Sequence, residues 1–127
     1  MDRSWYDSLN KSPLTPPSWI IGQVWSVLYM LMILSLFVYI RTSPTPQGLA
    51  LFFIQLFFNL TWSKLFFVEK VVCVSLVNII FMNIFVFLTI IEFRKTSKVA
   101  SNLLVPYMLW ILFAMYLNYY ICTNNKI

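Results

Sequence analysis

The sequence predicts an all-α integral membrane protein, a bundle of four transmembrane helices. Of its 127 residues, 61% are hydrophobic and only 10% are charged, whereas a soluble domain carries about 25% charged residues. The mean hydropathy is +0.80. The 9 Lys and Arg and 4 Asp and Glu residues gather in short clusters. The uncharged stretches between them are about 20 residues long, enough for a helix to cross ~30 Å of hydrocarbon. A soluble enzyme fold, a disordered chain and a collagen-like chain are excluded.

The predicted elements follow one another in a single domain. They are a loop over residues 1–16 and spans over about residues 17–40, 48–67, 71–93 and 98–122, all within the domain 1–127. Thr15 is expected to cap the first span, and Ser97 the fourth, which contains Pro106. A proline-rich connection at 43–48 follows the first span, and a short charged hinge at 64–70 follows the second.

The charged residues and cysteines limit the partners. Basic residues at helix ends attract anionic lipid headgroups, so the net charge of +5 predicts membrane lipids and no nucleic acid as partners. They divide almost evenly between the two membrane sides, so they give no orientation. The absence of histidine and the presence of only two cysteines predict no metal site and no cofactor. Cys73 and Cys122 fall on one membrane side, where a disulfide is conceivable, but small buried apolar side chains are the favoured interpretation.

Polar and aromatic residues recur along one face of each span. These faces contain Gly22, Trp25, Ser26 and Tyr29; Gln55, Asn59 and Trp62; Ser75, Asn78 and Met82; and Tyr107, Trp110, Ala114 and Asn118. From the residues alone, hydrogen bonding between helices is favoured, and an aromatic-walled cavity for a small molecule is the alternative. Glu69 and Glu92 lie at span ends, so a proton-coupled exporter with a buried carboxylate is disfavoured. Hydrolytic catalysis is disfavoured because no nucleophile–base pair is apparent.

Three motifs lie in order along the chain. They are W-Y-D-S-L-N-K at 5–11 with P-P-S-W-I-I-G-Q-V-W-S-V-L-Y-M at 16–30, Q-L-F-F-N-L-T-W-S-K-L-F-F at 55–67, and L-V-P-Y-M-L-W-I-L-F-A-M-Y-L-N-Y at 104–119. Their residues and separations resemble those of the TspO/translocator protein (peripheral benzodiazepine receptor) family. The resemblance covers nearly the whole chain.

The resemblance implies a five-helix, usually dimeric membrane bundle that binds porphyrins and, in animals, cholesterol. It implies a receptor, not an enzyme, with a porphyrin or other lipophile as ligand and a link to tetrapyrrole transport or stress regulation. A homodimer is a candidate assembly, and a bacterial cell membrane is favoured over a mitochondrial one. Carried over by motif, the ligand-binding residues are Trp25, Tyr29, Asn59, Trp62, Trp110, Ala114 and Leu117, supported by Gln55, Gly22 and Asn118 and covered by loop residues Trp5 and Tyr6.

The chain also departs from the family pattern. It would begin in the loop that joins the family's first and second helices, which predicts the five-helix bundle minus its first helix. Leu14 replaces a usual tryptophan, which weakens the case for light-dependent porphyrin breakdown, and bulky residues after Ala50 disfavour the family's close dimer contact. Residues 117–126 fit a proposed cholesterol pattern that is only hypothesis-grade. The alternative function is a non-catalytic membrane interaction subunit or a truncated, inactive family member.

Overall fold

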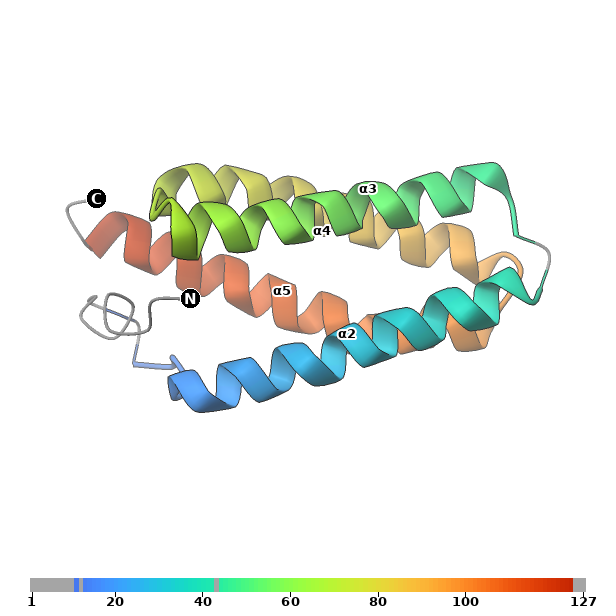
Figure 1. The fold of residues 1–127 in the computed structure, drawn as a ribbon, viewed down its shortest axis with the longest axis horizontal. Coiled ribbons are helices and arrows are strands. Elements are labelled where there is room, and N and C mark those ends of the chain that lie inside the picture. Colours follow the sequence, from blue (N-terminus) through green and yellow to red (C-terminus); the bar gives the residue numbers. More distant parts are fainter. Residues whose placement is uncertain (1–10, 12, 43, 125–127) are drawn as a thin grey trace.

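The computed structural model describes residues 11, 13–42 and 44–124, and they form a bundle of long helices (Figure 1). The elements are α2 (Ser18–Ile40), α3 (Pro46–Ser63), the π-helix η1 (Lys64–Val68), α4 (Val72–Arg94) and α5 (Lys98–Asn124). Successive helices run in opposite directions, so α2 begins and α5 ends at the same end of the bundle. The predicted all-α fold is confirmed within these ranges.

In the part of the chain that the structure describes, four helical segments are long and apolar enough to cross a membrane. They are Trp19–Ile40, Pro46–Val68, Val72–Arg94 and Lys98–Asn124. Large apolar side chains lie on the outer surface, among them Ile33 at 67% exposed and Phe57 and Leu109 at 63%. Such a surface is stable against lipid and not against water. The protein is therefore a multi-pass membrane protein.

The helix ends differ from the prediction in two places. Pro17, not Thr15, precedes α2 as its N-cap, and the buried Thr15 hydroxyl has no hydrogen-bond partner among the described residues. Pro16 and Pro17 have no backbone N–H, so they cannot donate a hydrogen bond to a capping oxygen of Thr15. The predicted hinge after α3 is instead the π-helix η1, in which the Glu69 N–H bonds the Lys64 carbonyl at 2.9 Å. The predicted Ser97 cap is confirmed, because its hydroxyl accepts from the Ala100 N–H at 3.1 Å.

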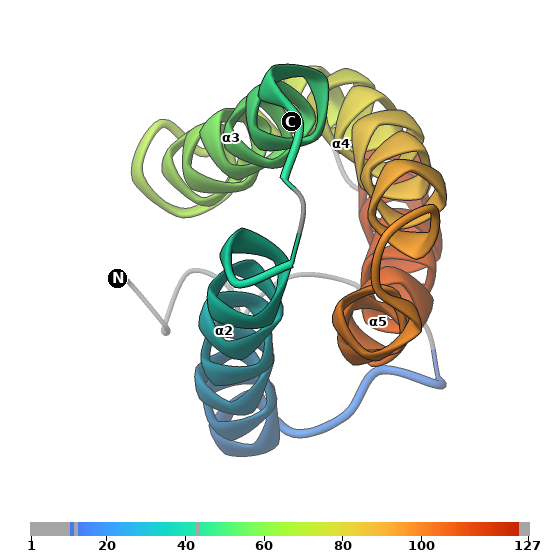
Figure 2. The same cartoon turned by 90° about the vertical axis from the view of Figure 1, so that its right-hand side faces the viewer.

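Seen along its axis, the bundle has the order α3, α4, α5, α2 (Figure 2). The main helix contacts join α3 to α4, α4 to α5, and α5 to α2. Long side chains link α2 to α3: the rings of Trp25 and Trp62 lie 6.0 Å apart, and the Gln55 amide contacts the Met32 sulfur at 3.6 Å. The space between α2 and α3 is therefore filled by side chains from both helices.

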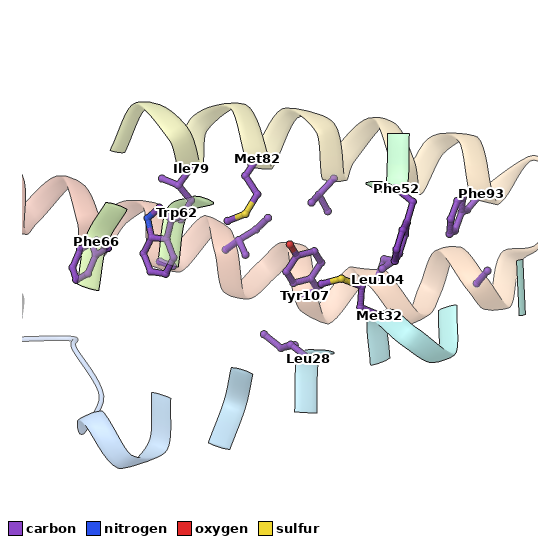
Figure 3. Packing of buried hydrophobic residues seen from close by; sticks show 14 of the residues in the cluster. Leu28, Met32, Phe52, Trp62, Phe66, Ile79, Met82, Phe93, Leu104 and Tyr107 are labelled. Carbon is purple, nitrogen blue, oxygen red and sulfur yellow. The ribbon is translucent and has the colours of Figure 1, made fainter. Parts of the chain in front are cut away.

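Buried apolar residues run along the whole bundle (Figure 3). Trp62 and Phe66 lie toward one end of this core, and Phe52 and Phe93 lie toward the other. At the second end the Tyr39 ring stacks on Phe93 with centroids 3.8 Å apart. A Cβ atom at Gly48 would lie 2.1 Å from the Tyr39 hydroxyl, so this close approach requires glycine.

A disulfide joins Cys73 to Cys122, so the favoured interpretation of these cysteines as buried apolar side chains was wrong. Cys73 lies in the first turn of α4 and is exposed, and Cys122 lies in the last turn of α5. Because α4 and α5 are antiparallel neighbours, these two turns meet, and the Cα atoms lie 5.1 Å apart, within the range that a disulfide bridges.

Candidate functional site

A small cavity of about 30 Å³ lies between α2, α3–η1 and α5, at the end of the bundle where α2 begins. Its lining is apolar and aromatic apart from one amide side chain. The lining residues are Ile21, Trp25, Trp62, Phe66, Phe67, Trp110, Ala114, Leu117, Asn118 and Ile121. Three tryptophans, one from each of three helices, therefore surround one cavity.

Helical spacing explains why these side chains face the same space. In α5 the lining residues recur every three or four positions, which puts them on one helix face: Trp110, Ala114, Leu117, Asn118 and Ile121. Ile21 and Trp25 are four residues apart in α2. The π-helix η1 packs more residues into each turn than an α-helix does. Consistent with this wider turn, both Phe66 and Phe67 reach the cavity.

Aromatic contacts hold the cavity walls together. The Trp62 ring lies 6.0 Å from Trp25 and 5.2 Å from Phe66. Trp25 also meets Tyr107 edge-on at 6.5 Å. Such pairs contribute about 0.5–1.5 kcal/mol each beyond their area burial. Large flat rings therefore form the surfaces that a ligand entering the cavity would meet.

One turn deeper in the bundle, four polar side chains form a continuous hydrogen-bond chain. The Tyr29 hydroxyl donates to the Asn59 side-chain oxygen. The Asn59 amide donates to the Tyr107 hydroxyl at 2.8 Å, and that hydroxyl donates to the Gln55 side-chain oxygen at 2.8 Å. The Gln55 amide ends the chain on the Met32 sulfur. The chain joins α2, α3 and α5 beneath the cavity.

A second polar cluster centres on Asn118, in the cavity wall. Its side-chain oxygen accepts from the Trp62 indole N–H at 2.8 Å and from the Ser75 hydroxyl at 3.2 Å. Its amide donates to the Val72 carbonyl at 2.9 Å. Asn118 thus fixes the orientation of Trp62 and connects α3, α4 and α5.

Trp110 differs from the other tryptophans of the wall. Its indole nitrogen is buried and has no hydrogen-bond partner among the residues that the structure describes. An unsatisfied buried donor costs about 1–3 kcal/mol.

The structure brings most of the predicted site residues together. Six line the cavity: Trp25, Trp62, Trp110, Ala114, Leu117 and Asn118. Tyr29, Asn59 and Gln55 belong to the polar chain beneath it. Gly22 is exposed, and a Cβ there would meet open space, so its predicted supporting contact is not seen. Trp5 and Tyr6 lie outside the described residues. The ligand-binding roles of all these predicted site residues stay predictions.

Sequence reasoning missed several residues. Ile21, Phe66, Phe67 and Ile121 line the cavity, and Tyr107, named only as part of a polar face, is the centre of the polar chain. Spacing of four residues from Trp25 and from Trp62 could have indicated Ile21 and Phe66. Phe66 is 2% exposed and belongs to the core.

These features define the class of protein: a helical membrane bundle with an aromatic-walled cavity between three of its helices. Within this class the chain belongs to the TspO/MBR family, which it matches over residues 1–123.

Three relatives illustrate the relationship. Tryptophan-rich protein TspO of Chlorobaculum tepidum is 40% identical over 127 residues, covering 96% of this chain and 80% of that protein. The tryptophan-rich sensory protein of Cereibacter sphaeroides is 36% identical over 91% of this chain and 73% of its own length. The translocator protein of Ovis aries is 31% identical over 96% of this chain and 75% of its own length. None of these three names denotes an enzyme.

Proposed function

We propose that this protein is a membrane receptor that binds a porphyrin, or another flat lipophilic molecule, in the cavity between α2, α3 and α5. The observation that carries the proposal is the meeting of Trp25, Trp62 and Trp110 around one cavity. Indole faces stack well on a large flat apolar ring system. A tetrapyrrole offers such a ring system together with polar edge groups for the unpaired Trp110 N–H.

The size of the cavity implies that a ligand opens it. About 30 Å³ is room for a water molecule, whereas sites for drug-sized ligands measure about 300–1,000 Å³. The rings of Trp25 and Trp62 lie 6.0 Å apart. A flat ligand stacked between them needs a ring separation of ~7–8 Å, twice the usual contact distance. Because side chains mediate much of the contact between α2 and α3, a small shift of α2 provides this room.

The lining favours binding over catalysis. Among the described residues that line the cavity there is no carboxylate, lysine or cysteine, and the one polar side chain apart from the indoles is Asn118. A hydrolytic reaction needs a nucleophile and a base within hydrogen-bond reach. We propose the bacterial cell membrane as the location and transport or sensing of a tetrapyrrole as the biological role.

The test is a porphyrin titration of the protein in lipid nanodiscs, followed by quenching of tryptophan fluorescence. The proposal predicts saturable quenching with one porphyrin for each site. Empty nanodiscs carrying the same porphyrin measure unspecific partitioning into lipid. Quenching that rises linearly with porphyrin, without saturation, would contradict the proposal.

A second candidate function, that of a non-catalytic interaction subunit, is favoured by the polar chain. Asn59 uses both its side-chain oxygen and its amide within the protein, on Tyr29 and on Tyr107. A side chain so engaged ties helices together and has less capacity left for a ligand. The absence of any ligand-induced rise in thermal stability would favour this second function.

A further inference from the structure

The disulfide marks one end of the bundle. Cys73 and Cys122 lie in the terminal turns of α4 and α5, and Cys73 is exposed. This end also contains the cavity, since Ile121 of the lining precedes Cys122. Disulfides persist in oxidising compartments such as the bacterial periplasm, whereas cytosolic thiols are kept reduced. The compartment that faces this disulfide end is therefore an oxidising one.

The opposite end of the bundle is basic. Four exposed cationic residues lie at the connections between α2 and α3 and between α4 and α5: Arg41, Arg94, Lys95 and Lys98. Glu92 is the acidic residue at this end; it is buried and bonded to Lys95 at 3.0 Å. These connections lie together at the end of the bundle away from the disulfide (Figure 1).

Side-chain contacts bring the two connections of the basic end into one surface. Tyr39, two residues before Arg41, stacks on Phe93, the residue before Arg94. The Thr45 hydroxyl, at the start of α3, donates to a Glu92 carboxylate oxygen at 3.2 Å. The two connections therefore lie against each other, and their four exposed cations are here called the basic patch.

We infer that the protein has one fixed orientation, with the disulfide end toward the oxidising compartment and the basic end against the anionic phospholipid headgroups of the cytoplasmic leaflet. The number of basic residues on each side gives no orientation, but the disulfide does. The basic patch then lies against the cytoplasmic leaflet, whose anionic lipids attract Lys and Arg. It follows that a ligand reaches the cavity from the oxidising side. This last step alone rests on the proposed binding function.

The test is labelling of single added cysteines with a membrane-impermeant maleimide in spheroplasts of a bacterial host. Glu69→Cys reports on the disulfide end and Thr96→Cys on the basic end; both positions are exposed. We expect Glu69→Cys to be labelled in intact spheroplasts and Thr96→Cys only after detergent opens the membrane. The opposite pattern, or equal labelling of both, would overturn the orientation. Repeating both in a Cys73→Ser/Cys122→Ser background excludes exchange with the native disulfide.

Two further measurements test the disulfide and the basic patch separately. Cys73 and Cys122 of the unaltered chain should react with maleimide only after denaturation and treatment with a dithiol reductant. Reaction without the reductant would remove the basis of the inference.

The second measurement concerns the basic patch. Replacing Arg94, Lys95 and Lys98 together by Gln should let Thr96→Cys be labelled from outside in a measurable fraction of molecules. Lys64→Gln, at the disulfide end, is the control and should not change the labelling. Unchanged labelling in the triple variant would contradict the role of the basic patch. None of these readouts uses porphyrin, so they are independent of the binding proposal.

Discussion

Trp62 donates its indole N–H to the side-chain oxygen of Asn118 across 2.8 Å, and this bond joins α3 to α5 in the wall of the cavity. Both residues are buried, with Asn118 at 1% exposed. The bond leaves the Trp62 ring face free to meet Trp25. Asn118 therefore has a structural role that determines the shape of the candidate site.

Replacing Asn118 by Leu should destabilise the protein by about 1–3 kcal/mol. The change leaves the buried Trp62 N–H without its acceptor, and an unpaired buried polar group costs about this much. The Val72 carbonyl keeps its bond from the Ser75 hydroxyl at 2.7 Å. Thermal unfolding in detergent measures the effect. Asn102→Leu, at an exposed position of α5, is the matched control and should leave the melting temperature nearly unchanged.

Asn59→Leu should lower the melting temperature while weakening porphyrin binding less than Trp110→Ala does. Asn59 does not line the cavity, and its polar atoms bond Tyr29 and Tyr107. The measurement is a porphyrin titration at a temperature where the variant is folded. Loss of binding by folded Asn59→Leu would show instead that this residue contacts the ligand.

Gly48→Ala should destabilise the protein by about 1–3 kcal/mol, because the added methyl would overlap the Tyr39 hydroxyl and overpack the junction of α2 and α3. Gly22→Ala is the control at a helical glycine with open space beside it. It should stabilise the protein by up to about 1 kcal/mol, the difference in helix propensity between the two residues. Equal effects of the two changes would contradict the packing described for Tyr39.

Breaking the disulfide should lower stability by about 2–4 kcal/mol. The bond links residues separated by 49 positions and restricts the unfolded chain. A dithiol reductant should lower the melting temperature of the unaltered protein. The Cys73→Ser/Cys122→Ser variant should start at the lower value and not respond to the reductant. A response of the double variant would show that the reductant acts elsewhere.

The fold and much of the candidate site could be predicted because both depend on helical periodicity. Long apolar stretches indicate the four spans, and the spacing of Gln55, Asn59 and Trp62 puts them on one face, where the structure buries all three. Trp110 follows from the same periodicity in α5.

The remaining features depend on how different helices align, which periodicity does not determine. The bonds of Tyr107 require α3 and α5 in one particular register. Pairing of Cys73 with Cys122 requires the ends of α4 and α5 to meet. The π-helix after Ser63 lets the adjacent residues Phe66 and Phe67 both line the cavity, and ordinary helical spacing from Trp62 does not indicate Phe67.

The most direct test of the proposed binding site is the porphyrin affinity of Trp110→Ala compared with Phe87→Ala. Trp110 lines the cavity, and its N–H has no partner among the described residues. Phe87, by contrast, lies on the outer surface of α4, 51% exposed. Loss of a stacked aromatic side chain and its donor should cost at least about 1.4 kcal/mol, a tenfold weakening. We predict that Trp110→Ala, still folded, binds porphyrin at least about tenfold more weakly, while Phe87→Ala binds like the unaltered protein. Porphyrin binding by Trp110→Ala with unchanged affinity would contradict the assignment of this cavity as the ligand site.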